Sequence, residues 1–130
     1  MNQQEFENQV MPMLLDGDYP VLASLRHQYQ NSTIEKRIFS GAGFFTYFKM
    51  KEGIPPLEKK NFEIGDVIIN IDNIKNAIGV ILFIREGYLF FLEAYTLVID
   101  DWPNEYSDVV LKYFGRDGKR DYKDLNKQWT

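Results

Sequence analysis

The stretch IGVILFIREGYLFFLEAY, residues 78–95, is the most apolar part of the chain and decides its fold. With its flanks it is long enough to span a bilayer. Arg85, Glu86 and Glu93 interrupt it, however, and each charge costs roughly 2.5 kcal/mol or more at a bilayer centre. Arg85-Glu86-Gly87 also separates two runs rich in β-branched and aromatic residues, which is typical of a hairpin whose turn ends in a left-handed glycine. The stretch therefore predicts a β-hairpin.

The turn also predicts which residues face each other across the hairpin. If Ile84 and Tyr88 flank a three-residue turn, Gly79 lies opposite Glu93, where the missing side chain leaves room for the carboxylate. Both faces of the hairpin are then apolar, a pattern of strands that are covered on both sides. We therefore predict a central hairpin over residues 77–96.

Glu93, inside this hairpin, has two interpretations. It is a structural carboxylate at the margin of the sheet, satisfied by a tyrosine hydroxyl or a basic side chain. Alternatively, it lies in an aromatic pocket with a raised pKa and a binding role. Tyr95 is its neighbour on the same face, and Tyr47 is a second tyrosine whose hydroxyl needs a partner. These three residues are candidates for binding a ligand or partner.

An acidic pair beside a Trp-Pro, DDWP at residues 100–103, follows the hairpin directly. Trp102 packs in the core next to a turn, or it forms a recognition surface together with Asp101, because tryptophan is enriched at binding hot spots. Both residues join the candidates for partner binding.

The remainder predicts an α+β fold, in which two N-terminal helices pack on a mainly antiparallel sheet of about five or six strands. Apolar spacing predicts a helix over residues 3–16, with a kink or restart at Pro12. Asp18 is the expected N-cap of a second helix that runs from Pro20 to about Tyr29. Further strands are expected at residues 34–40, 44–50, 62–72 and 106–114, and a short charged helix ends the chain. With no repeat and no long linker, residues 1–130 form a single domain.

Composition narrows the class of protein. The 130 residues suit one domain with its own core, and the absence of cysteine excludes disulfides and thiolate metal sites. A net charge of −4 argues against nucleic acid as the main partner. The N-terminus lacks the basic and apolar segments of a signal peptide, so we expect a cytoplasmic protein with no membrane partner.

Known catalytic patterns do not occur. The single histidine, His27, lies off the apolar stripe of its predicted helix, where a solvated side chain is expected, and a zinc site built on imidazoles lacks its second ligand. No GxSxG surrounds a serine, and SGAGFF at residues 40–45 lacks the lysine of a phosphate-binding loop. The sequence therefore predicts no enzyme, no metal and no cofactor. An enzyme built on carboxylates such as Glu93 and Asp66 is the remaining catalytic alternative.

Four phrases, FSGAGFFTYF, IGDVIINIDN, GVILFIREGYLFFLEAYT and DWP, together resemble a group of small bacterial proteins without an assigned activity. That group follows the loose pattern TGxGFFTxF, GDV, LFxxxGxLxxLExYTY and WP. The resemblance covers residues 39–103. This chain has Ser40 in place of the threonine, Ala94 where glycine is commoner and Leu97 in place of the last tyrosine. It also has Tyr47 where histidine is usual, so any role that needs an imidazole there is lost. The resemblance implies a bacterial, cytosolic, single-domain protein.

These observations favour a non-enzymatic protein-interaction module, such as an immunity-type inhibitor or an assembly factor, whose acidic charge suits a basic protein partner. A homodimer is a second expectation, because one helix pair covers only one of two apolar sheet faces. The alternative is a small-ligand-binding domain with an aromatic pocket around Glu93.

Overall fold

The computed structural model of the chain describes residues 1–72, 74, 77–96, 102–103 and 105–130. The two longer helices come first, the strands follow one another along the chain, and a short helix comes last. They are α1 (Gln3–Leu14), α2 (Pro20–Gln30), β1 (Ser32–Ser40), β2 (Gly43–Met50), β3 (Phe62–Asn70), β4 (Ile78–Arg85), β5 (Tyr88–Tyr95), β6 (Val110–Tyr113), a short 3-10 turn (Arg116–Gly118) and α3 (Tyr122–Asn126).

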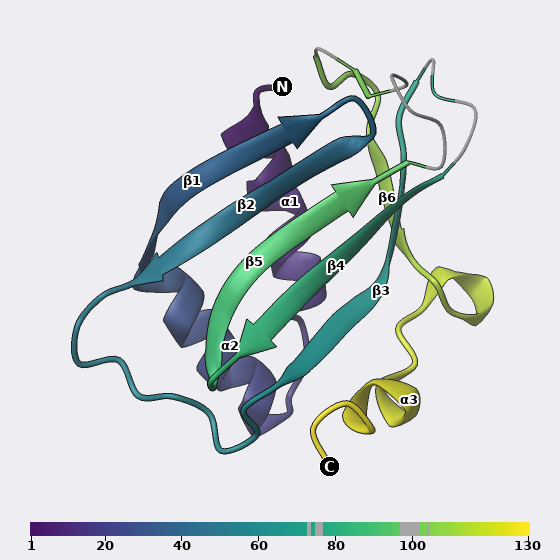
Figure 1. Ribbon diagram of the computed structural model, residues 1–130. Coiled ribbons are helices and arrows are strands. Elements are labelled where there is room, and N and C mark those ends of the chain that lie inside the picture. The colour runs from purple at the N-terminus through teal and green to yellow at the C-terminus, as the bar shows by residue number, and fades with distance from the viewer. Residues whose placement is uncertain (73, 75–76, 97–101, 104) are drawn as a thin grey trace.

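The strands form one antiparallel sheet of six strands in the order β1-β2-β5-β4-β3-β6. The β4–β5 hairpin lies in the middle of this order, as the sequence predicts. α1 and α2 both lie against one face of the sheet, and α3 lies beside the start of β3 (Figure 1). The predicted α+β fold, with two N-terminal helices on an antiparallel sheet, is therefore confirmed.

The core lies between the two N-terminal helices and the sheet. Period-two alternation along the strands turns every second side chain toward the helices, and an apolar stripe on each helix meets them. The largest fully buried side chains there are Phe6, Met11, Leu14, Leu15, Leu22, Leu25, Phe44, Ile64, Ile69, Ile78, Leu82 and Ile84.

The predicted three-residue hairpin turn is wrong. Glu86 and Gly87 have φ values of 54° and 83°, so the turn has two residues of positive φ, as in a type I′ turn, whose twist matches that of the flanking strands. A register shift beyond Ile84 then places Phe83 opposite Phe91 and Ile81 opposite Glu93. Because the net slip from the predicted register is two residues, each of these side chains keeps its predicted face.

Gly79 therefore makes room for a tyrosine and not for Glu93. It pairs with Tyr95, and a Cβ on Gly79 would lie 2.5 Å from Cζ of that ring. Any larger residue at this position would push the Tyr95 ring off the sheet.

Three details of the helices and the last strand differ from expectation. α1 runs through Pro12 without a restart, and Tyr19 replaces Asp18 as the N-cap of α2, because Pro20 occupies the first helical position and holds the preceding residue extended. The last strand begins at Val110, since Tyr106 is buried in the core and its ring stacks on Phe6. None of the described helices is long and apolar enough to cross a membrane.

A buried glutamine joins α2 to the central hairpin. Nε2 of Gln28 donates to the carbonyl of Gly87 at 2.9 Å, and Oε1 accepts from the backbone N–H of Leu89 at 3.0 Å. The side chain thus satisfies the N–H of Leu89 and adds a second donor to the carbonyl of Gly87, which also accepts from the N–H of Leu57 at 2.8 Å.

Candidate functional site

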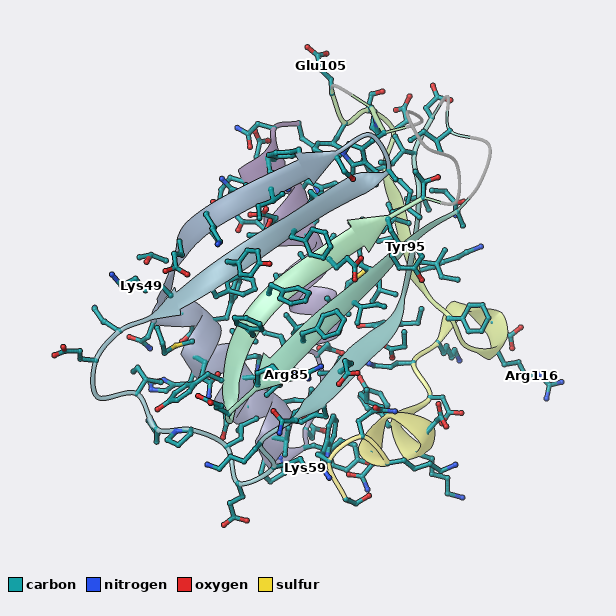
Figure 2. All side chains as sticks on the ribbon, viewed as in Figure 1. Lys49, Lys59, Arg85, Tyr95, Glu105 and Arg116 are labelled. Atoms are coloured by element: carbon teal, nitrogen blue, oxygen red, sulfur yellow. The ribbon has the colours of Figure 1, made fainter. Side chains whose placement is uncertain are left out.

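The sheet face that lies opposite α1 and α2 is not covered by any described element (Figure 1). The side chains there alternate with those of the core along β2, β4 and β5. Figure 2 shows Tyr95 on this face, with Arg85 at the hairpin end. We call this surface the open face. Its apolar and acidic members in the centre of the sheet are Ile38, Phe45, Tyr47, Ile81, Phe83, Phe90, Phe91, Glu93 and Tyr95.

Phe91 is the centre of a ring cluster on the open face. Its ring centroid lies 4.4 Å from that of Phe83, 5.1 Å from Phe90 and 5.3 Å from Tyr47. Phe45 joins the cluster at 5.5 Å, with its ring nearly perpendicular. Tilted and edge-to-face pairs of this kind hold one another in place. The cluster is therefore a preformed surface that loses little conformational entropy on binding.

Glu93 lies within this cluster. Its pairing partners are Phe45 on β2 and Ile81 on β4, and Phe91 and Tyr95 flank it on the same strand. The side chain is half-buried, and no described residue donates a hydrogen bond to its carboxylate or forms an ion pair with it. Burial raises the pKa of Glu93, because desolvation disfavours the charged form.

This raised pKa predicts a pH-dependent effect of Glu93→Gln on stability. The folded chain holds the Glu93 proton more tightly than the unfolded chain, so the protonated form stabilises the fold below the ordinary value of 4.5, and this contribution is lost as pH rises through the folded pKa. Glutamine cannot ionise. We therefore expect Glu93→Gln to raise the melting temperature more at about pH 7 than at about pH 4. An equal effect at both pH values in thermal denaturation would contradict the burial of this carboxylate.

Basic side chains surround the rings. Nζ of Lys36 lies 4.7 Å from the ring centroid of Tyr47, and the guanidinium of Arg85 lies 5.2 Å from that of Phe83. Arg85 also pairs with Glu63 at 3.1 Å. Lys49 follows Tyr47 on the same side of β2, at the end of the strand (Figure 2). The open face thus combines an aromatic centre, one unpaired carboxylate and a basic rim.

A groove of about 350 Å³ borders the open face at Ile81 and Tyr95. It continues past Gly65 to α3 and is lined by four carboxylates, those of Glu63, Asp66, Asp121 and Asp124. Asp66 is held in an ion pair with Arg120 at 2.8 Å, which engages this carboxylate structurally.

Of the five predicted candidates, the structure brings Glu93, Tyr95 and Tyr47 together on the open face. It places Trp102 on the helix side of the sheet, where the indole contacts Phe44 at 5.5 Å and donates from Nε1 to the Tyr106 hydroxyl at 3.2 Å. Asp101 lies outside the described residues. His27 is exposed on α2, as expected.

Sequence reasoning did not single out the centre of the ring cluster. Alternation along residues 44–50 predicts that Phe45 and Tyr47 lie on the same face of their strand. This pattern is the sequence signal that indicates part of the ring cluster. Phe90 and Phe91 follow each other in sequence, so alternation alone sends them to opposite faces. The bulge at this point brings both rings to the open face.

The described residues contain no group of three or more histidine and carboxylate side chains that could hold a metal ion. Comparison with known proteins finds no matching family model, no similar curated protein and no matching solved structure. The fold is that of an α+β protein whose sheet is covered by helices on one side.

Proposed function

We propose that this chain is a non-enzymatic protein-interaction module that binds its partner through the open face. The observation that carries the proposal is the ring cluster around Phe91, which no described element covers. Monomeric proteins rarely expose a contiguous apolar patch larger than a few hundred Å², and larger patches mark interaction sites. A cytoplasmic inhibitor of the immunity type or an assembly factor is the kind of role that such a module serves.

The open face has the anatomy of an interface. Phe90 and Tyr95 are 44% and 38% exposed, so a partner can bury them further, whereas the rings beneath them are already packed. Aromatic anchors surrounded by polar groups that exclude water are typical of binding hot spots. The basic rim and Glu93 then restrict which partners fit, because a partner must present carboxylates to the rim and a cation to Glu93, and such an association weakens with salt.

Affinity capture tests this function. We expect a tagged bait to retain one stoichiometric protein, and Phe90→Ser to reduce its capture by at least about tenfold, as loss of a hot spot does. Phe39→Ser is the matched control, because Phe39 is 56% exposed but packs on the helix side against Phe44. Unchanged capture by both Phe90→Ser and Tyr95→Ser would contradict an interface on the open face.

A small-ligand-binding domain is the second candidate, favoured by the groove beside Tyr95. Its volume of about 350 Å³ lies within the range of ligand pockets, and its carboxylates would select a cationic compound. In this case Asp124→Asn, which removes an exposed carboxylate from the lining of the groove, would lower the stabilisation that the ligand confers in a thermal-shift screen while the protein stays folded.

A further inference from the structure

The open face carries both halves of an ion pair that its own chain does not form. Glu93 has no basic partner among the described residues. The ammonium groups of Lys36 and Lys49 likewise have no carboxylate within 4.0 Å in the described part of the chain. Arg85 and Glu63, the other charged pair on this face, are bonded to each other and so need no external partner.

We propose that the occupant of the open face is a second copy of this chain, bound face to face about a two-fold axis. The inference rests on the proposed function and names the partner of the same surface. In a two-fold interface the same patch meets itself, so a stable contact requires each copy to present both a carboxylate and its cation. Glu93 and Lys36 fulfil this requirement on one patch.

The register of the sheet shows how the two charges meet. β5 and β1 flank β2 on either side, so a two-fold axis along β2 places β5 of one copy over β1 of the other. At the level of Glu93 the sheet carries Phe45 on β2 and Ile38 on β1. Lys36 lies two residues farther along β1, about 7 Å away, which the length of a lysine side chain can bridge. Each copy would then give one Glu93–Lys36 pair to the other.

The overlap of the two copies predicts a weak dimer. With the axis along β2, the strands that lie over one another are β1, β2 and β5 of each copy. Three strands about 4.8 Å apart, over eight residues that rise about 3.3 Å each, cover roughly 380 Å² per copy, or roughly 760 Å² in total, a small contact of the kind made by weak, transient complexes. Packed sheets lie about 10 Å apart with interdigitated side chains, a space that two layers of aromatic rings can fill.

An ion pair between the two copies also explains why the carboxylate of Glu93 lies among aromatic rings. An ionised group that loses its water needs an opposite charge, or its burial is strongly unfavourable. In the single chain Glu93 is only half-buried and keeps part of its hydration. In the dimer the lysine of the second copy replaces that water and fixes the register of the two sheets.

Sedimentation equilibrium of the full chain, from about 1 to about 300 µM, tests the proposal, because interfaces at this end of the size range give weak dimers. We expect a reversible monomer–dimer equilibrium. Glu93→Lys and Lys36→Glu should each weaken it by at least about tenfold, and the double variant, which swaps the charges in both copies, should restore it.

Glu105→Lys and Lys59→Glu are the matched controls, since they make the same charge changes at exposed positions outside the open face (Figure 2). Both should dimerise like the parent chain. Circular dichroism checks that each variant is folded. Should Glu93→Lys unfold the chain, Lys36→Glu and Tyr95→Ser still test the interface, because both residues are exposed.

A monomer at every concentration would overturn the proposal, and so would a dimer that neither charge reversal weakens, such as one formed by pairing of the β1 edges. The two proposals fail separately. Capture of a different protein that depends on Phe90, with no self-association, would leave the open face as an interface and remove the second copy as its occupant. Capture that substitutions on the open face do not change, together with a chain that stays monomeric, would contradict both proposals.

Discussion

Replacing Arg120 with methionine is expected to lower the free energy of unfolding by about 3–5 kcal/mol, the usual loss when one partner of a buried pair is removed. The side chain is 1% exposed and donates two hydrogen bonds to Asp66, at 2.8 and 3.1 Å. Three further bonds go to the carbonyls of Met13, Leu14 and Asp16, at 3.0, 2.7 and 2.7 Å.

The loss is large because Arg120 satisfies two groups at once. It forms an ion pair with the carboxylate of Asp66 on β3. It also donates hydrogen bonds to carbonyl groups at the C-terminus of α1, where a helix leaves its last carbonyls without intrahelical partners. Methionine fills much of the same volume but donates no hydrogen bond. The carboxylate of Asp66 and the carbonyl of Leu14 would then lose the donors that Arg120 supplies, whereas the carbonyl of Met13 keeps the hydroxyl of Tyr113 at 2.6 Å.

Urea denaturation followed by circular dichroism measures this loss. Arg116→Met is the control, because Arg116 is exposed on the neighbouring turn and makes no ion pair with a described residue (Figure 2). Its effect should stay within about 0.5 kcal/mol. A loss below about 1 kcal/mol for Arg120→Met would mean that α1 and β3 are held together by apolar packing alone.

Replacing Glu7 with alanine should cost about 3 kcal/mol, because this carboxylate is the centre of a second buried network. Glu7 is 2% exposed and accepts two hydrogen bonds from Arg37, at 2.7 and 2.9 Å, which raise the pKa of the guanidinium. It also accepts from the hydroxyl of Thr46 at 2.5 Å and from the amide of Gln3 at 2.8 Å. Alanine would leave the Thr46 hydroxyl, which is fully buried, without its acceptor.

A double-mutant cycle with Arg37→Met separates the ion pair from the rest of the Glu7 network. We expect a coupling energy of at least about 1 kcal/mol from chemical denaturation, because the two residues are in direct contact. Glu52→Ala, at an exposed loop position, controls for the change of charge and should have little effect. Additive losses in the cycle would show that Glu7 acts through Thr46 and Gln3 only.

The central hairpin shows which structural features the sequence predicts and which it does not. Charges within the apolar run exclude a membrane span, and Gly87 marks the turn, so the hairpin and its two faces follow from local chemistry. The register does not, because the loop length and the bulge beside Phe90 depend on contacts with Gln28 and with the neighbouring strands. The error of two residues exchanged the partner of Gly79 but kept Ile81 and Glu93 on one face. The bulge turns Leu89 into the core and Phe90 onto the open face, so the predicted faces of these two residues are wrong.

The two ionic networks were not predicted, for a reason of chain topology. Arg120 lies in RDGKRD, a segment that reads as a charged turn, and its partners in α1 are more than a hundred residues away. The sequence around Glu7 is typical of the polar side of a surface helix. Its hydrogen-bond donor Thr46 lies 39 residues away along the chain. No local pattern distinguishes such charges from solvated ones, because their burial is a consequence of packing.

The sequence by itself determined the class of fold, the central hairpin, the helix-covered face and the candidacy of Glu93, because these depend on hydrophobic periodicity and turn chemistry that act over a few residues. The tertiary structure alone decided which charges are buried in pairs, that Trp102 packs apart from Glu93, and that Phe91 gathers four rings around it. These features arise when strands distant in sequence become neighbours, and the register that joins them depends on packing across the whole sheet.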